Sequence, residues 1–65
     1  MRGTVDEFDE AKGYGTVRSD EGQDYFFHCT QIADGTRSIP QGVEVEFEVV
    51  PGRNGHWEAT AIERC

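Results

Sequence analysis

Two short segments bring together the residues of this chain that could bind a ligand. Lys12-Gly13-Tyr14-Gly15-Thr16-Val17 places a lysine beside an aromatic ring, and Tyr25-Phe26-Phe27-His28 is a run of three aromatic residues and a histidine. Rings beside a lysine suit unpaired nucleobases, which stack on aromatic faces with little sequence preference. The chain has no nucleophile–base pair at a recognisable spacing, so we do not expect an enzyme.

Both segments are expected to be strands of one antiparallel hairpin. Ser19-Asp20-Glu21-Gly22 between them is a turn signal that ends in glycine. Residues two apart on a strand share a face, so Tyr14 lies with Thr16, and Phe26 lies with His28. If the two faces coincide, the sheet presents a small aromatic platform. We expect the glycines at 13 and 15 to leave the Tyr14 ring open to a flat partner.

The same residues resemble the two RNA-binding motifs of the cold-shock domain family. Lys12 to Val17 is similar to the first motif, Lys-Gly-Phe-Gly-Phe-Ile, with tyrosine for the first phenylalanine. Phe26-Phe27-His28 is similar to the centre of the second, Val-Phe-Val-His-Phe. The resemblance covers nearly the whole chain. It implies an all-β fold, a five-stranded antiparallel Greek-key barrel of the OB type, formed by residues 1–65 as one domain.

By this resemblance, the function is non-catalytic binding of single-stranded RNA or DNA, as in RNA chaperones and regulators. The residues that it implies at the binding face are Phe8, Lys12, Tyr14, Phe26, His28, Arg37 and Arg53. The rings of Tyr14, Phe26 and His28 would stack on bases, and Lys12 would contact phosphate. Three residues also have another interpretation: Phe8 as a core aromatic, His28 as a structural histidine, and Arg37 as a solvated loop charge.

Four positions depart from the family pattern. Asp6 and Glu7 stand where the family has Lys and Trp, Thr16 where it has Phe, and Cys29 where it often has an aromatic residue. The chain has 13 acidic and 6 basic residues and a net charge of -7. This charge also opposes the binding of phosphate groups. These features support an alternative, a protein-interaction or structural module that keeps the barrel and binds nucleic acid weakly or not at all.

Length and hydropathy limit the number of domains and the membrane contact that we expect. A chain of 65 residues makes one domain, and a chain of this size buries only about 60% of its surface on folding. No apolar run approaches the roughly 20 residues of a membrane span, and Met1-Arg2 runs straight into the first strand. We therefore expect a cytoplasmic monomer without membrane contact.

Alternating polar and apolar residues predict the strands and the core. The expected strands are Arg2–Phe8, Tyr14–Arg18, Asp24–Cys29, Val43–Val49 and His56–Glu63. The residues expected in the core are Val5, Phe27, Ile32, Ile39, Ala59, Ala61, Ile62 and the apolar set of the fourth strand. The glutamates of that strand face water, away from the core. Trp57 either caps the core or lies near the platform, where it would replace the missing ring of position 7.

Neither a metal site nor a cofactor is expected. His28, Cys29, His56 and Cys65 are potential zinc ligands, but no close Cys-x-x-Cys pair is among them. In a cytoplasmic chain the two cysteines are expected to be unrelated reduced thiols.

Overall fold

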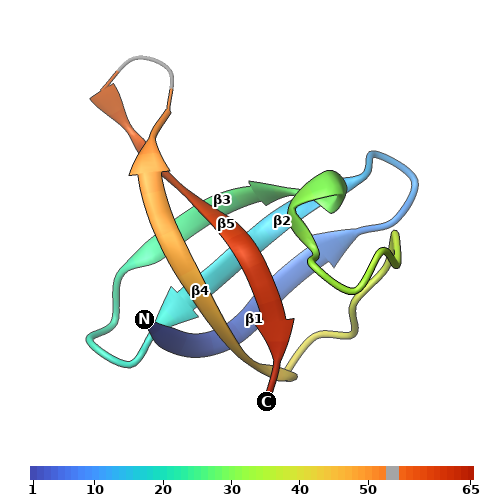
Figure 1. Cartoon of the computed structure of the whole chain (residues 1–65), viewed down its shortest axis with the longest axis horizontal. Helices are drawn as coiled ribbons and strands as arrows, with labels where there is room; N and C mark the ends of the chain where they lie inside the picture. The colour runs from blue at the N-terminus through green and yellow to red at the C-terminus, as the bar shows by residue number, and fades with distance from the viewer. Residues whose placement is uncertain (53–54) are drawn as a thin grey trace.

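Five strands form a closed barrel in the computed structural model, which describes residues 1–52 and 55–65 (Figure 1). The elements are β1 (Arg2–Asp9), β2 (Tyr14–Ser19), β3 (Asp24–His28), the short 3-10 helix η1 (Cys29–Gln31), β4 (Glu44–Pro51) and β5 (Trp57–Arg64). Each strand lies within one or two residues of its expected bounds. The helix found in the described residues is too short and too polar to cross a membrane.

The strand order around the barrel is β1-β2-β3-β5-β4, and β4 closes it by pairing with β1. Among the strands that the structure describes, the pairings are antiparallel except for that of β3 with β5, where Phe26 lies opposite Glu58 in parallel. Figure 1 shows β4 and β5 crossing the sheet of β1, β2 and β3. The predicted five-stranded barrel of the OB type is confirmed. Closure leaves few free strand edges, which suits a chain with so small a core.

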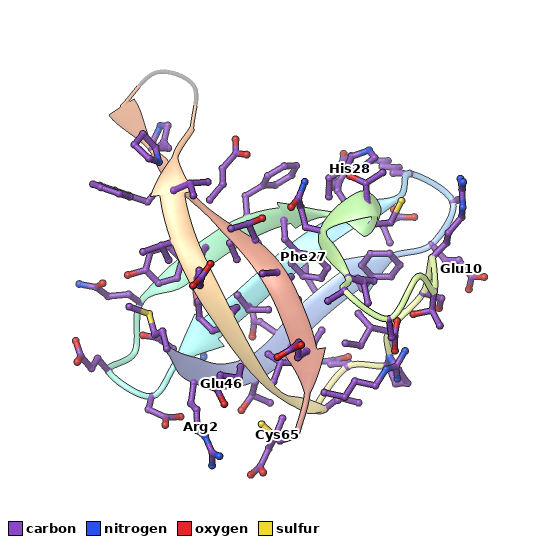
Figure 2. The ribbon with its side chains drawn as sticks, viewed as in Figure 1. Arg2, Glu10, Phe27, His28, Glu46 and Cys65 are labelled. Carbon is purple, nitrogen blue, oxygen red and sulfur yellow. The ribbon has the colours of Figure 1, made fainter. Side chains whose placement is uncertain are left out.

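One cluster of apolar side chains fills the barrel. Its buried members are Val5, Val17, Phe27, Ile32, Ile39, Val45, Phe47, Ala59 and Ile62. Phe27 lies inside the barrel in Figure 2, while Glu46 projects from β4. The alternation predicted along β4 is confirmed, because Val45 and Phe47 are buried and the glutamates that alternate with them are exposed. Each large side chain in this cluster contributes about 1.5–3 kcal/mol by leaving water.

Ala61 is not a core residue, and this expectation was wrong. The β4–β5 register moves from Glu46↔Glu63 to Glu48↔Thr60, so β5 carries one extra residue opposite β4. At this bulge Ala61 has a positive φ of 52° and faces solvent. A bulge breaks strict alternation, so Ile62 keeps its place in the core while Ala61 does not.

Trp57 does not cap the core, because 54% of its surface is exposed. It lies at the start of β5 and lines an open hollow with Tyr25 and His56. Of the two interpretations of this residue, the core cap is therefore wrong.

Candidate nucleic-acid interface

Three rows of residues run across β1, β2 and β3 and set which side chains share a face. The rows are Glu7–Thr16–Phe26, Phe8–Gly15–Phe27 and Asp9–Tyr14–His28. The middle row faces the core, as the buried Phe27 and Gly15 indicate. The outer two rows face solvent. The structure thus brings Tyr14, Thr16, Phe26 and His28 together on one face of the sheet.

Tyr14 and Phe26 form the centre of this face. They are diagonal neighbours across the β2–β3 pair, and their ring centroids lie 5.3 Å apart with planes tilted by 43°. This separation is within the range of favourable aromatic pairs. Tyr14 remains 37% exposed and Phe26 40% exposed. We call Tyr14, Phe26 and His28 the aromatic platform.

Gly15 supports the platform in a different way from that expected. A Cβ atom at Gly15 would overlap the carbonyl oxygen of Glu7 and lie 2.8 Å from the Cα of Phe8. Glycine is therefore needed for the close approach of β1 to β2, on the inner side of the sheet. It does not serve to clear space around the ring of Tyr14.

Phe8 is turned toward the core by a bulge in β1. Val5 pairs with Val17 and Glu7 with Thr16, so Asp6 is the extra residue. Phe8 is half-buried and stacks on Phe27, with ring centroids 5.6 Å apart and planes 16° from parallel. This geometry supports the core interpretation of Phe8. A contact between its remaining exposed edge and a ligand stays a prediction.

His28 ends β3 and caps the helix η1 that follows. Its Nδ1 accepts a hydrogen bond from the backbone N–H of Thr30 at 3.3 Å. The Thr30 hydroxyl lies 3.1 Å from the same nitrogen, and Cys29 Sγ lies 3.8 Å from it. The imidazole is exposed at the outer end of β3 (Figure 2). His28 is therefore both a structural cap and a surface residue.

Lys12 lies in the turn between β1 and β2, immediately before the platform. Its backbone N–H donates to Asp9 Oδ1 at 3.1 Å, which helps to hold the turn. The side chain is exposed. Arg37 is likewise exposed, in the loop before β4. Within residues 1–52 and 55–65, neither base forms an ion pair. Arg53 lies outside the described residues.

Arg18 is held by two carboxylates. Its Nε lies 2.9 Å from Asp24 Oδ1, and its Nη2 lies 3.8 Å from Asp6 Oδ1. The hydrogen bond to Asp24, together with the charges of Asp24 and Asp6, raises the pKa of Arg18 above its ordinary value. Arg2 and Arg64 are also paired with carboxylates. The bases open to phosphate are therefore few, as the net charge suggests.

Acidic residues lie both near the platform and away from it. The exposed glutamates of β4 are Glu44, Glu46 and Glu48. In the barrel order β4 lies between β1 and β5, so these glutamates are at least one strand away from β2 and β3. Glu7 and Glu58 are different, because they share a row with Phe26, on β1 and β5.

The four potential zinc ligands do not form a cluster. No group of three or more His, Cys, Asp or Glu side chains suited to a metal occurs in the part of the chain that the structure describes. Cys29 is buried next to His28, whereas Cys65 is exposed at the C-terminus, and both are free thiols. The absence of a metal and of a cofactor stays a prediction.

Comparison with known proteins identifies the family to which this fold belongs. The family model described as the 'Cold-shock' DNA-binding domain matches residues 1–65. The chain belongs to the cold-shock domain family. Members of this family bind nucleic acids, which supports the prediction of nucleic-acid binding and not the alternative of an interaction module.

Relatives and one solved structure match over almost the whole cold-shock domain. The cold shock-like protein of Thermotoga maritima is 45% identical over 56 residues, which are 85% of each chain. Cold shock protein CspD of Bacillus subtilis is 43% identical over 64 residues, or 97% of each chain. The solved structure, drosophila Unr CSD456, has a TM-score of 0.80 and 32% identity. It is longer, since the match covers 98% of this chain and 26% of that one.

Two neighbours of the platform were missed in the sequence. Thr30 contacts His28 from within the next turn, and a cap of this kind is detectable, because a helix-capping side chain accepts from a backbone N–H two or three residues on. Glu58 lies beside Phe26 across the parallel β3–β5 contact. No local signal reveals a pairing between residues so far apart in the chain.

Proposed function

We propose that this cold-shock domain binds single-stranded RNA or DNA by stacking bases on the aromatic platform. The observation that supports this best is the exposed Tyr14–Phe26 pair, whose rings lie 5.3 Å apart on one face of the sheet. The protein acts without catalysis, as a cytoplasmic monomer that keeps RNA unpaired. The contacts proposed around the platform come from Phe8, Lys12, Arg37 and Arg53.

Stacking has to supply most of the affinity, because the charge does not. Each base stacked on an aromatic side chain contributes about 1–3 kcal/mol. Lys12 and Arg37 are the exposed bases that the described residues leave unpaired, whereas Glu7 places a negative charge in the row of Phe26. We therefore propose modest affinity, with little dependence on phosphate contacts.

Alanine substitution of the two rings tests the proposal. Tyr14→Ala and Phe26→Ala should each weaken binding of a labelled single-stranded oligonucleotide, measured by fluorescence anisotropy, by roughly five- to a hundredfold. Both rings are exposed by more than a third, so the thermal unfolding midpoint should change little. Val50→Ala shortens an exposed apolar side chain on β4, which pairs with neither β2 nor β3, and is the control. An equal loss in all three variants, or no binding by the unmodified protein, would reject the proposal.

A further inference from the structure

The hydrogen bonds around His28 fix where its proton lies. A backbone N–H can only donate, and the N–H of Thr30 points at Nδ1 from 3.3 Å. Nδ1 must therefore offer its lone pair and carry no proton. The Thr30 hydroxyl at 3.1 Å and the Cys29 thiol at 3.8 Å are also potential donors, so they are compatible with the same state. A neutral imidazole then carries its proton on Nε2.

The Nε2–H group belongs to the ligand face. Nδ1 is turned toward η1, and Nε2 lies on the other side of the ring, in a side chain that is exposed. His28 is also the direct cross-strand partner of Tyr14, whose ring is part of the platform. No hydrogen bond joins Nε2 to any residue of 1–52 or 55–65. A base stacked at Tyr14 would therefore meet a hydrogen-bond donor of fixed position at its edge.

We propose that His28, held by Thr30 as the Nε2–H tautomer, selects keto bases over amino bases at this position of the platform. Uracil, thymine and guanine present a carbonyl oxygen at the edge where cytosine and adenine present an amino group. A fixed donor bonds the carbonyl and opposes the amino group. The inference rests on the proposed function, and it assigns to His28 a role in specificity that stacking alone does not provide.

The tautomer is tested without any ligand. In protein labelled with 15N, correlation spectra of the imidazole distinguish the protonated from the unprotonated ring nitrogen in buffer where imidazole is neutral. We expect the proton on Nε2 of His28. A proton on Nδ1 would overturn the inference while leaving the proposed function standing.

Selection is tested with two pyrimidine oligonucleotides of equal length, oligo-U and oligo-C, because their bases have the same size and differ in the edge group. We expect oligo-U to bind more tightly. His28→Phe keeps a ring for stacking and removes the donor, so the ratio of the two dissociation constants should fall by about two- to tenfold. His28→Gln restores an N–H donor without the ring and should keep more of the ratio than His28→Phe. The NMR spectrum of each variant checks its fold.

Each other outcome has a separate meaning. If His28→Phe weakens both oligonucleotides equally, the donor contacts a group that both share, such as a phosphate, and the selection of bases is wrong. If His28→Phe leaves the ratio unchanged in a folded protein, the inference also fails. If the unmodified protein binds neither oligonucleotide, the proposed function fails, and the inference fails with it.

Thr30 is the positioning residue in this scheme. Thr30→Val keeps the backbone N–H and removes the hydroxyl at 3.1 Å, whereas Thr30→Ser keeps both donors. We expect Thr30→Val to raise the population of the Nδ1–H tautomer and to lower the oligo-U preference, and Thr30→Ser to preserve both. A tautomer population that is identical in the two variants would show that Thr30 does not set the proton by its hydroxyl.

Discussion

Glu7 lies directly opposite Thr16 in the β1–β2 pairing, and Thr16 in turn opposes Phe26 in the β2–β3 pairing. Along this row, the outer face of the sheet therefore carries two polar side chains and one aromatic ring. By the family resemblance, Glu7 and Thr16 stand where other cold-shock domains have aromatic rings. Positions 7 and 16, which lack rings here, lie in the same row as the Phe26 ring. Single substitutions at these positions should therefore extend the platform.

Glu7→Trp should tighten binding of single-stranded oligonucleotides. The new ring would lie in the row of Phe26 and provide one more stacking surface, which contributes about 1–3 kcal/mol, or roughly five- to a hundredfold in affinity. Removal of a negative charge near the phosphates adds to this gain. Glu7→Gln removes the charge and adds no ring, so anisotropy titrations of both variants separate the two effects. Equal affinities for the two variants would show that the ring contributes nothing.

Thr16→Phe should extend the platform on β2, between Glu7 and Phe26. Thr16 is half-buried on the outer face, so a larger side chain there extends into solvent and leaves the core packing unchanged. The expected gain in affinity is that of one base stacked on an aromatic ring. The substitution does not change the charge of the protein. Thr16→Val is the matched control, since it is β-branched and has no ring. A folded Thr16→Phe protein with no gain would place the binding face elsewhere on the barrel.

Single strands should bind more tightly than a duplex of equal length, because a duplex hides the base faces that the platform needs. The salt dependence should be shallow. Contacts from Lys12, Arg37 and Arg53 would give a slope of log K against log salt of about -2 at most, at about -0.7 per phosphate contact in a single strand. Titrations over a range of salt concentrations measure this slope. A much steeper slope, or equal affinity for duplex, would indicate a surface that binds through phosphates.

Acid should weaken the barrel partly through Asp34. Hydrogen bonds from the side chain and backbone of Thr36, and then the contact with Arg64, lower the pKa of Asp34 below its ordinary value of 3.8. A carboxyl whose pKa is lowered by folding stabilises the native state above the unfolded pKa, and this contribution is lost as the pH falls through the folded pKa. Asp34→Asn should therefore lower the melting temperature at neutral pH and flatten its decline below pH 3.8.

Asp20→Asn removes the same charge from an exposed turn and provides the control for that measurement. Melting curves at a series of pH values compare the two variants with the unmodified protein. If Asp34→Asn and Asp20→Asn change the acid limb by the same amount, the hydrogen bonds of Asp34 do not contribute to stability.

The structural features that could be predicted from the sequence are those that depend on residues close together in the chain. Alternation placed Phe27, Val45 and Phe47 in the core, and the two motifs placed Tyr14 and Phe26 on one face. The core positions follow from residues two apart on a strand, and the shared face of Tyr14 and Phe26 follows from the hairpin that joins two neighbouring strands. The unpredictable part depends on partners that are distant in the chain.

Ala61 is an example of a residue whose position depends on a distant part of the chain. The bulge that turns it outward exists because β5 has one residue more than β4 over the same span, and a single strand does not contain this information. The role of Gly15 likewise depends on how closely β1 approaches β2. Glu58 reaches Phe26 only when the barrel closes. The platform and the acidic Glu7 beside it could be located from the sequence, but Glu58 could not.

The parallel contact between Phe26 on β3 and Glu58 on β5 has a consequence for the order of folding. Every ring of the platform comes from one hairpin of neighbouring strands, so its residues can meet early, at a small cost in loop entropy. Closure waits for β5, which is made last and must find β3 from across the chain. A chain that stops before Trp57 would hold all the platform residues on an open sheet of β4, β1, β2 and β3, without Ala59 and Ile62 to pack against. Such a nascent chain should not hold its rings in place, so binding should begin only when the last strand has left the ribosome.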